Sequence, residues 1–532
     1  MADTPSARLE LRKAHLGLMF AATLVLAACG GGGSNAGDQV LGTSPSPSPV
    51  APVAPVPSPP PSAVAQSCAP TNPYRADATS ATTVGTLAGE KAWAKSYMEQ
   101  AYLWWEEIPA VNADAPAYSD TSKVEESLDA YFRALKTPLF TASGKRKDEF
   151  SFTYPTKAWN DRSQSGSSAG YGIEWYFSSP TPPRGLKVAF VEPNSPADLA
   201  GVRRGDALVS TDGVSADVNS EAGVVALNAA LFPSASGSPH SFVFAPVTGG
   251  TRNVKLTSAT VVSTPVPNTK VLTTGDGRRV GYILFNAHIA SAEGQLITAV
   301  NTLRDSAVQD LVLDLRYNGG GYVYIASSLA YMVAGASRTS GQVFEQFQYN
   351  SKRTADTNAD SAKTPFFNTS CYLDANFQCP RQEPLPTLNL GRVFVLTSPG
   401  TCSASEAIIN GLRGVNVEVV LIGDTTCGKP YGFRAKDNCG ISYFPIEFKG
   451  TNAKGFGDYA DGFAPTCPAN DDFSRALGDP AEGQLAAALY RVDKGVCNPA
   501  LGRAAPKAAG NAAPKGGVLR GPERENRILL PR

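Results

Sequence analysis

A serine stands at the start of a predicted helix, where its hydroxyl could be activated. The segment VFVLTSPGTCSASEAIINGLRG is typical of a hydrophobic strand, a loop and a helix, and Ser403 lies at the turn into the helix. Ser403 and Glu406 fit the capping pattern S-x-x-E, so on its own Ser403 is most simply a helix cap. The positive end of a helix also stabilises anions, so the position suits a nucleophile, with the Ala404 N–H as an oxyanion donor.

A lysine follows the next predicted strand along the chain. In VEVVLIGDTTCGKPYGF, Lys429 lies between Gly428 and Pro430 at the carboxyl end of that strand. A lysine in a loop is usually solvated. If this strand lies beside the strand that leads to Ser403, the lysine could lose water, which lowers its pKa and lets it accept the serine proton as a general base.

A glycine-rich turn follows a third predicted strand. In LVLDLRYNGGGY, the turn at residues 318–321 comes directly after a buried strand. Glycines let a backbone N–H approach a substrate carbonyl closely, so Gly319 or Gly320 is a candidate for a second oxyanion donor. In the same segment, we interpret Asp314 and Arg316 as a structural ion pair rather than as catalysts.

Strands and helices alternate around these three segments. The predicted strands are GYILFNAHI, DLVLDLRY, RVFVLTSPG and VEVVLIGD, and the predicted helices are GQLITAVNTLRD, SSLAYMVAG and SEAIINGLRG. Apolar strands separated by helices indicate βαβ units with a parallel sheet that is covered on both faces. Ligands of such sheets bind at the carboxyl ends of the strands, and all three segments fall there.

The three segments, in this order, resemble the C-terminal processing (tail-specific) peptidases and their relatives, including the tricorn core. The family patterns LILDLRxNxGG, SASE and GxxTxGK have the counterparts DLVLDLRYNGGG, CSASE and GDTTCGK here. The resemblance implies a ClpP/crotonase-like α/β peptidase core over residues 265–500. The roles that it implies are Ser403 as nucleophile, Lys429 as general base, and Ala404 with Gly319 or Gly320 as oxyanion hole.

Two positions depart from the family pattern. The best-known members have a glutamine four residues after the lysine, which helps to orient it, and that place is Phe433 here. Lys429 follows Ser403 by 26 residues, one more than the spacing associated with the family's standard form. Both reacting groups remain, so these departures bear on how the lysine is oriented rather than on the class of chemistry.

Residues 163–264 have short β-type runs separated by turn signals. Within them, VEPNSPADLAGVRRGDALVSTDGV resembles the bacterial PDZ domain, and the resemblance extends into a peptide-binding loop. Its predicted peptide-binding residues are Gly170, Tyr171, Gly172 and Ile173. Glycines there would free backbone N–H groups to bind a peptide C-terminus, which then adds as a strand to a sheet edge. The simpler alternative is that they are turn glycines.

The N-terminal part of the folded chain, residues 68–162, is predicted to be a small helical domain. Apolar residues recur at helical spacing over residues 88–107 and again over residues 124–135. We interpret the tryptophans of the first stretch as core residues. The predicted fold class is therefore multidomain, α/β and α+β, with a helical domain, a PDZ-like β domain and the peptidase core.

The N-terminus resembles that of a bacterial lipoprotein. Basic residues precede the apolar run LGLMFAATLVLAA, which is too short to span a bilayer and ends in Leu-Ala-Ala-Cys. This predicts a signal peptide over residues 1–28 and lipidation of Cys29. Residues 29–67 are a Gly/Pro-rich linker, and residues 501–532 are predicted to be a disordered tail. The expected location is a membrane of the cell envelope, with the outer membrane favoured because no Asp follows Cys29.

Composition narrows the choice of partners. The 532 residues carry 47 basic and 47 acidic side chains, a formal net charge of zero, which gives no reason to expect nucleic acid as a partner. The expected partners are unfolded or tail-exposed protein substrates. Nine cysteines minus Cys29 leave an even number for disulfides in an oxidising compartment. The favoured pairs are Cys371–Cys379, Cys467–Cys497 and a bond between Cys402 and Cys427.

Two alternatives remain open at this point. A cysteine peptidase could use Cys402 with His288, although a disulfide at Cys402 is the better interpretation of its position. A PDZ-bearing scaffold on a peptidase fold that has lost its activity would explain Phe433, but it would not need both Ser403 and Lys429. No cofactor is expected, and no cluster of metal-ligating residues has ligand spacing.

Overall fold

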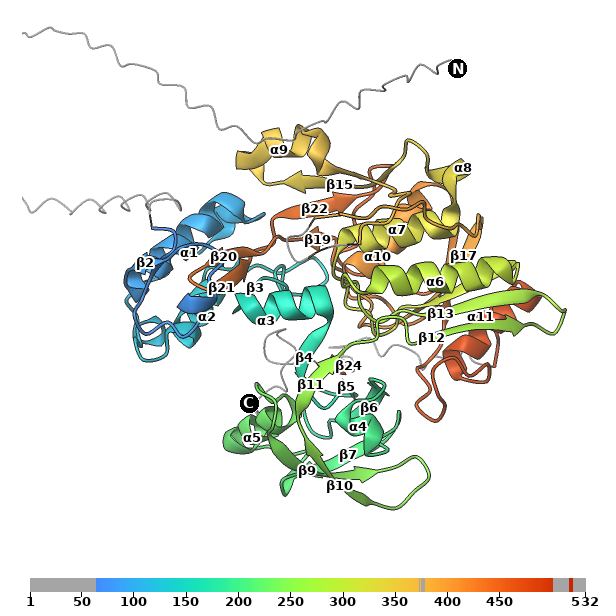
Figure 1. Ribbon diagram of the computed structural model, residues 1–532, viewed down its shortest axis with the longest axis horizontal. Coiled ribbons are helices and arrows are strands. Elements are labelled where there is room, and N and C mark those ends of the chain that lie inside the picture. The colour runs from blue at the N-terminus through green and yellow to red at the C-terminus, as the bar shows by residue number, and fades with distance from the viewer. Residues whose placement is uncertain (1–63, 373, 375–377, 501–515, 520–532) are drawn as a thin grey trace, which may run out of the picture. The chain divides into compact units, whose positions relative to one another are not determined.

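The computed structural model describes residues 64–372, 374, 378–500 and 516–519 (Figure 1). The predicted signal peptide, the predicted lipidation site Cys29 and nearly all of the 29–67 linker lie outside these residues. Among the described residues, no helix has both the length and the apolar character needed to cross a bilayer. The described chain is a mixed α/β multidomain structure with several separate sheets.

Two helices form the N-terminal region. The first begins where the Thr86 hydroxyl accepts a hydrogen bond from the Gly89 N–H at 3.1 Å. It ends at Ala101 rather than near residue 107 as predicted, because the Leu103 N–H turns away to donate to the Ile446 carbonyl at 2.7 Å. Trp93 is buried, as expected. The bounds are α1 Leu87–Ala101 and α2 Val124–Ala134, with short strands β1 Ser67–Cys68 and β2 Thr83–Val84.

This helical region packs on a sheet to which a much later part of the chain contributes. The strand order is β20-β21-β3, with β3 at Phe152–Pro155, β20 at Lys436–Asn438 and β21 at Ile441–Phe444. The ring of Tyr443 in β21 contacts Trp93 and Phe132 in edge-on geometry, with centroids 5.0 and 5.6 Å apart. The helices therefore share one apolar core with residues more than 300 positions later.

A second sheet, antiparallel in every strand pair, forms the predicted 163–264 module together with a strand from the C-terminal end. Its order is β10-β9-β7-β6-β5-β24, with β8 beside β7, and an aromatic stack of Trp175, Phe242 and Phe244 lies in its core. Its elements are β5 Ile173–Phe177, β6 Lys187–Val191, α4 Pro196–Leu199, β7 Ala207–Thr211, β8 Val214–Ser215, α5 Glu221–Leu231, β9 Pro239–Ala245, β10 Arg252–Thr257 and β24 Gly517–Leu519. A separate pair, β4 Ser167–Gly170 and β11 Ala259–Val262, borders it.

The third sheet is the predicted parallel core. Its order is β12-β13-β14-β17-β18-β23, and every neighbouring pair is parallel except β12 with β13. The predicted alternation of strands and helices is confirmed. The elements are β12 Asn268–Thr273, β13 Arg279–Leu284, α6 Ala292–Asp305, β14 Asp310–Asp314, α7 Val323–Ala334, β17 Arg392–Thr397, α10 Ala404–Gly414, β18 Glu418–Gly423, β23 Cys467–Pro468 and α11 Gly483–Lys494.

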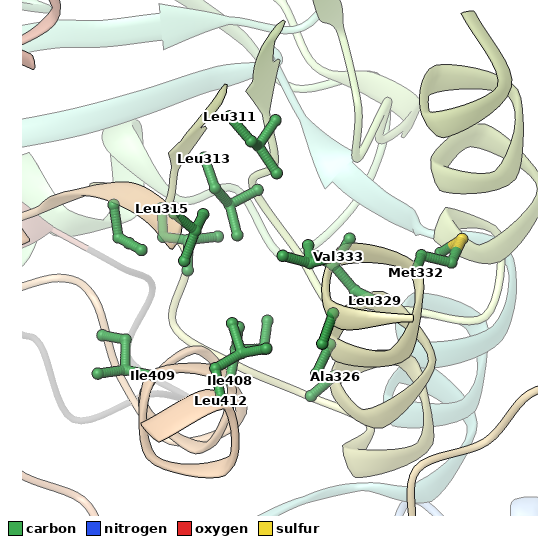
Figure 2. Close-up of a cluster of buried hydrophobic side chains, with 14 of the residues drawn as sticks. Leu311, Leu313, Leu315, Ala326, Leu329, Met332, Val333, Ile408, Ile409 and Leu412 are labelled. Carbon is green, nitrogen blue, oxygen red and sulfur yellow. The ribbon is translucent and has the colours of Figure 1, made fainter. Parts of the chain in front are cut away.

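Both faces of this sheet are covered, which explains why its strands are continuously apolar. On one face, Leu311, Leu313 and Leu315 point toward the apolar side chains of α7 and α10 (Figure 2). On the other face, residues between them in sequence, such as Val312, pack against α11. The core thus fixes the strand ends from which the three predicted chemical segments emerge.

A fourth sheet lies beyond the core helices and has the order β16-β15-β22-β19. It belongs to the predicted 265–500 region, and its last strand begins two residues after Lys429. The bounds are α8 Ala336–Thr339, β15 Val343–Tyr349, α9 Thr354–Asn358, β16 Lys363–Pro365, β19 Tyr431–Gly432 and β22 Phe448–Thr451; α3 Thr156–Asn160 follows β3.

Four disulfides join the eight remaining cysteines. Cys371–Cys379, Cys467–Cys497 and Cys402–Cys427 are present as predicted. The fourth, Cys68–Cys439, joins residues 371 positions apart and was not predicted.

The prediction of a disordered tail over residues 501–532 is wrong for one short stretch. Gly517–Leu519 form β24, which pairs antiparallel with β5. Composition concealed this strand because two glycines and two apolar residues carry almost no periodicity. The strand forms because an open sheet edge supplies its hydrogen-bonding partners.

Candidate active site

Ser403 lies in the turn between β17 and α10, in an unusual backbone conformation. Its φ is 56° and its ψ is −116°, a region in which a residue with a side chain is strained unless its surroundings hold it there. Its N–H donates to Glu406 Oε2 at 3.0 Å, the contact that the capping pattern predicts. The half-buried Ser403 lines a cleft of about 2260 Å³, and Lys429 lines the same cleft.

The buried Glu406 carboxylate ties the Ser403 loop to the Lys429 loop. Besides Ser403, it accepts hydrogen bonds from the N–H groups of Gly428 and Lys429 at 2.9 and 2.8 Å and from the Thr426 hydroxyl at 2.6 Å. Burial raises the pKa of Glu406 above its usual value, and these hydrogen bonds act in the opposite direction. One side chain therefore fixes the backbone on both sides of the cleft.

The same two loops are also joined covalently. The disulfide Cys402–Cys427 has a Cα–Cα distance of 5.2 Å, and its cysteines are one and two residues from Ser403 and Lys429. Because Cys402 is in this bond it has no free thiol, which argues against a cysteine nucleophile. Among the described residues, Cys402, Glu406 and Cys427 form a group close enough to hold a metal, but the disulfide leaves both sulfurs without a thiolate to bind one.

Two aromatic rings contact the Lys429 ammonium. Its Nζ lies 4.4 Å from the ring centroid of Phe433 and 5.1 Å from that of Phe150. Both distances lie within the range of a cation–π interaction. Phe433 occupies the place of the glutamine in the family pattern, and Phe150 comes from the segment before β3. These two rings orient the Lys429 ammonium group, and the sequence alone did not reveal their contact with it.

The glycine turn after β14 is packed directly against the Ser403 loop. A Cβ on Gly320 would lie 2.8 Å from the Ser403 Cβ and 2.9 Å from the Ala404 nitrogen, so no larger residue fits. The Gly320 N–H, however, donates to Asn318 Oδ1 at 3.0 Å. Of the two predicted donors in this turn, Gly319 is therefore the better candidate, and Gly320 is needed for the close approach of the two loops.

His288 stabilises this glycine turn through hydrogen bonds. It is fully buried, its Nδ1 lies 2.9 Å from Asn318 Oδ1, and its backbone N–H donates to the Gly320 carbonyl at 3.2 Å. Burial lowers the pKa of His288 to about 3, although hydrogen bonding of its ring with Asn318 and with the Gly320 backbone acts to raise it. Because the Asn318 Oδ1 is an acceptor, the Nδ1 of the neutral ring carries the proton. His288 thus holds the turn in place.

Asp314 and Arg316 form the predicted structural ion pair. The Arg316 Nε donates to Asp314 Oδ1 at 3.0 Å, and its two terminal nitrogens reach Glu482 at 2.8 and 2.9 Å. Arg316 also contacts Asp471, which pairs in turn with Arg204 from the loop before β7. This network, fully buried at Asp314, Arg316 and Glu482, connects the core sheet to the β5–β10 sheet.

The predicted peptide-binding loop lies apart from the lining of the cleft. The cleft reaches Glu174 and Phe177 of β5, whereas residues 170–173 do not line it. Gly172 has a φ of 78°, and a Cβ there would lie 2.2 Å from the Ser195 Cβ, so glycine is required. The Tyr171 carbonyl accepts the Ala197 N–H at 3.0 Å, which fixes the loop against α4.

Sequence reasoning missed two residues of this site. The S-x-x-E pattern predicts a helix cap at Glu406 and gives no sign of contacts with a loop 20 residues later. Phe150 lies more than 250 positions before Lys429, and no local pattern links the two. An unexplained phenylalanine at 433 was the one available signal that aromatic groups surround the lysine.

Residues 279–435 match the model of Peptidase family S41. The carboxyl-terminal-processing protease of Picosynechococcus sp. (strain ATCC 27264 / PCC 7002 / PR-6) is 28% identical over 246 residues, 46% of this chain and 50% of that protein. Carboxyl-terminal-processing peptidase 3, chloroplastic, of Arabidopsis thaliana is 26% identical over 307 residues, 57% of this chain and 53% of that protein. The chain thus spans about half the length of these curated relatives.

A solved structure shares the fold. The S41 protease structure from Bacteroides fragilis NCTC 9343 superposes with a TM-score of 0.55 and 24% identity, covering 75% of this chain and 97% of that one. All three segments of the candidate site fall within the S41 match. Residues 279–435 are therefore similar to the serine peptidases of family S41, as the resemblance of the three segments to the C-terminal processing peptidases predicted.

Proposed function

We propose that this protein is a serine-type endopeptidase that hydrolyses peptide bonds of envelope proteins through Ser403 and Lys429. The observation that carries the proposal is the Glu406 carboxylate, which accepts the backbone N–H groups of both residues. A buried carboxylate and a disulfide that fix the positions of two loops relative to each other are expected where a side chain from each loop must act together. The S41 match over the same residues supports the same chemistry.

In the proposed reaction, neutral Lys429 takes the proton from the Ser403 hydroxyl as its oxygen attacks the peptide carbonyl carbon. The lysine then gives this proton to the leaving amine, and the carbonyl carbon remains bonded to the serine oxygen as an ester. Water, activated by the same lysine, hydrolyses the ester and restores the serine. Closing the cleft over a substrate would remove water from the lysine end, which favours its neutral form.

The negative oxygen of the tetrahedral intermediate needs two donors. The Ala404 N–H, in the first turn of α10, is the first, and the positive end of that helix adds to its effect. The Gly319 N–H is the second, since Gly320 already donates to Asn318. The strained φ of Ser403 supports placing the active site at this turn, because residues held in such conformations cluster at catalytic sites.

Substrate chains are proposed to reach the cleft through the PDZ-like module, residues 163–264. The Gly170–Ile173 loop would bind a C-terminal carboxylate, and the substrate would add as a strand beside β5. Glu174 and Phe177 of β5 line the same cleft as Ser403, which gives a bound strand a direct path to it. The expected substrates are unfolded proteins or proteins with an exposed tail.

The proposed location is the cell envelope, with the protein anchored to the outer membrane through a lipid on Cys29; the sequence after Cys29 is the signal that favours the outer membrane. Four disulfides support an oxidising compartment. Fatty-acid labelling of the natural protein and of Cys29→Ser tests the anchor. Label in the natural protein alone is expected, and equal label in both would exclude lipidation at this residue.

A non-catalytic scaffold is the alternative, and one experiment separates the two. The purified protein and its Ser403→Ala variant are incubated with a reduced, carboxymethylated protein, and new amino termini are counted. The proposal expects cleavage by the natural protein and essentially none by the variant. No cleavage by either, while both remain folded, would leave the scaffold, whereas equal cleavage by both would show that Ser403 is not the nucleophile.

A further inference from the structure

The chain's own C-terminal segment occupies the edge of the sheet that the proposed function assigns to substrates. β24 pairs antiparallel with β5, with Gly517 opposite Phe177, Val518 opposite Tyr176 and Leu519 opposite Trp175. Without it, β5 would be the outermost strand and would present unpaired N–H and C=O groups. Such an edge accepts an extended peptide from any source. Figure 1 shows β24 lying beside β5.

The direction of β24 is that of the proposed ligand. Because the pairing is antiparallel and starts at Phe177, the segment runs toward Ile173, where β5 begins and where the predicted carboxylate-binding loop ends. A substrate whose C-terminus met that loop would have the same direction along β5 and would use the same backbone groups. β24 and such a substrate therefore cannot bind at the same time.

The segment also lies against the glycine turn and the Ser403 loop. Val518 is 6% exposed and packs in a cluster with Ala189 and Tyr317, the residue that precedes the glycine turn. A Cβ on Gly400, three residues before Ser403, would lie 3.1 Å from the Val518 methyl carbon Cγ2. Gly516, Gly517 and Val518 line the same cleft as Ser403 and Lys429.

The fit depends on Gly516, two residues before Val518. A Cβ on Gly516 would lie 2.5 Å from the Phe177 carbonyl oxygen and 2.8 Å from the Ser178 Cα, so only glycine allows this approach. The contact is nevertheless small, since the strand has three residues and is held by backbone pairing and, among its described side chains, by the buried Val518. An occupant held so lightly can be displaced by a longer or better-fitting strand.

We propose that residues 516–519 are an intramolecular competitor for the β5 edge, so that a substrate strand must displace them before it reaches the cleft. This inference rests on the proposed function of the β5 sheet in binding substrate strands. It predicts that residues 516–519 occupy the β5 edge in the protein without substrate. Its apparent affinity for an added strand is then lowered by the fraction of molecules in which the edge is occupied.

The test uses the full-length chain with Ser403→Ala, so that nothing is cleaved, and a fluorescent peptide with the sequence of residues 515–524. Val518→Asp places a charge in the apolar cluster and expels the segment. The expected result is roughly tenfold tighter peptide binding than with Val518 intact. Val84→Asp, at an exposed valine of β2, is the matched control and should change nothing. Val518→Ala should shift affinity in the same direction by less, which covers the case in which the aspartate disturbs the fold.

Equal affinity in all variants, or no binding to any of them, would overturn the competitor role. In parallel, cleavage of an unfolded protein is measured with the chains that keep Ser403. If cleavage persists while Val518→Asp leaves peptide binding unchanged, this inference fails and the proposed peptidase function stands. If cleavage is absent but binding tightens, the competitor role holds and the proposed catalysis fails.

Discussion

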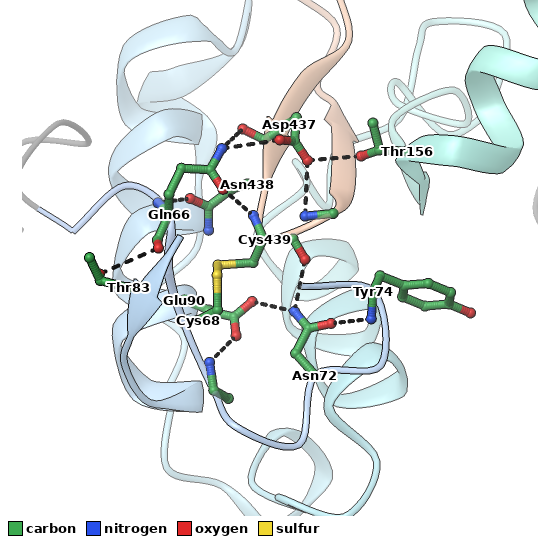
Figure 3. The surroundings of a disulfide bond; sticks show 12 residues. Gln66, Cys68, Asn72, Tyr74, Thr83, Glu90, Thr156, Asp437, Asn438 and Cys439 are labelled. Atoms are coloured by element: carbon green, nitrogen blue, oxygen red, sulfur yellow. Dashed lines mark hydrogen bonds between the residues drawn. A yellow bond between two sulfur atoms is a disulfide. The ribbon is translucent and has the colours of Figure 1, made fainter. Parts of the chain in front are cut away.

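The regions around Cys402–Cys427 and Cys68–Cys439 each combine a disulfide with a buried glutamate, and they differ in what these groups hold. In the first region, Glu406 accepts N–H groups from the two loops that line the cleft. In the second, Glu90 accepts the Ala69 N–H at 2.7 Å and the Asn72 amide at 3.0 Å (Figure 3). The first region holds the two loops of the proposed active site, and the second fastens the N-terminal helices to the core.

Sequence distance makes the contrast sharper. The first disulfide joins cysteines 25 residues apart, in loops that follow two neighbouring strands of one sheet. The second joins cysteines 371 residues apart. A long closed loop restricts the unfolded chain more than a short one. The second region should therefore matter more for stability, and the first more for turnover.

The largest expected effect concerns the first region. Lys429→Ala should lower the rate of peptide bond hydrolysis by about 10²- to 10⁴-fold, because the serine loses its general base. Lys429→Arg should not restore activity, since a guanidinium keeps its proton. Initial rates on a reduced, carboxymethylated protein give the comparison, and circular dichroism confirms folding. Full activity in folded Lys429→Ala would point to another base.

Removing each disulfide should separate stability from activity. Cys402→Ser with Cys427→Ser should cost about 3 kcal/mol of unfolding free energy. The same pair should lower turnover roughly 10- to 100-fold through misplaced loops. Cys68→Ser with Cys439→Ser should cost more, about 5 kcal/mol, while the folded fraction keeps its turnover. Denaturant unfolding and rates per folded molecule measure both quantities. The contrast between the two regions fails if the second pair reduces turnover as much as the first.

A smaller effect is expected at the second glutamate and depends on pH. Burial raises the pKa of Glu90 from 4.5 to about 7, so between these values the folded chain keeps a proton that the unfolded chain has released. The stability that this proton contributes is present at pH 4.5 and below, and it is lost as pH rises through 7. Glu90→Gln should therefore remove about 2–3 kcal/mol of the decrease in stability between pH 5 and pH 8. An unchanged decrease in the variant would place the proton elsewhere.

The local sequence pattern predicted the strands and helices of the core sheet, because each of them is a long run with a regular apolar pattern between short turn segments. The same reasoning reached Ser403, Lys429 and the glycine turn, since each directly follows one of those strands. It did not reach the Cys68–Cys439 bond or the packing of Tyr443 on Trp93, because these contacts join distant segments. It also could not assign β24, whose pairing depends on an open edge elsewhere in the fold.

The Ser403 and Lys429 pair is tested most directly by a double-mutant cycle. Hydrolysis rates of a reduced, carboxymethylated protein are measured for the natural protein, Ser403→Ala, Lys429→Ala and the double variant, each shown to be folded. If the two side chains act as one unit, either single loss nearly abolishes turnover and the double variant is little worse than the single ones. Losses that multiply in the double variant, or turnover that survives in folded Ser403→Ala, would contradict a Ser403–Lys429 mechanism.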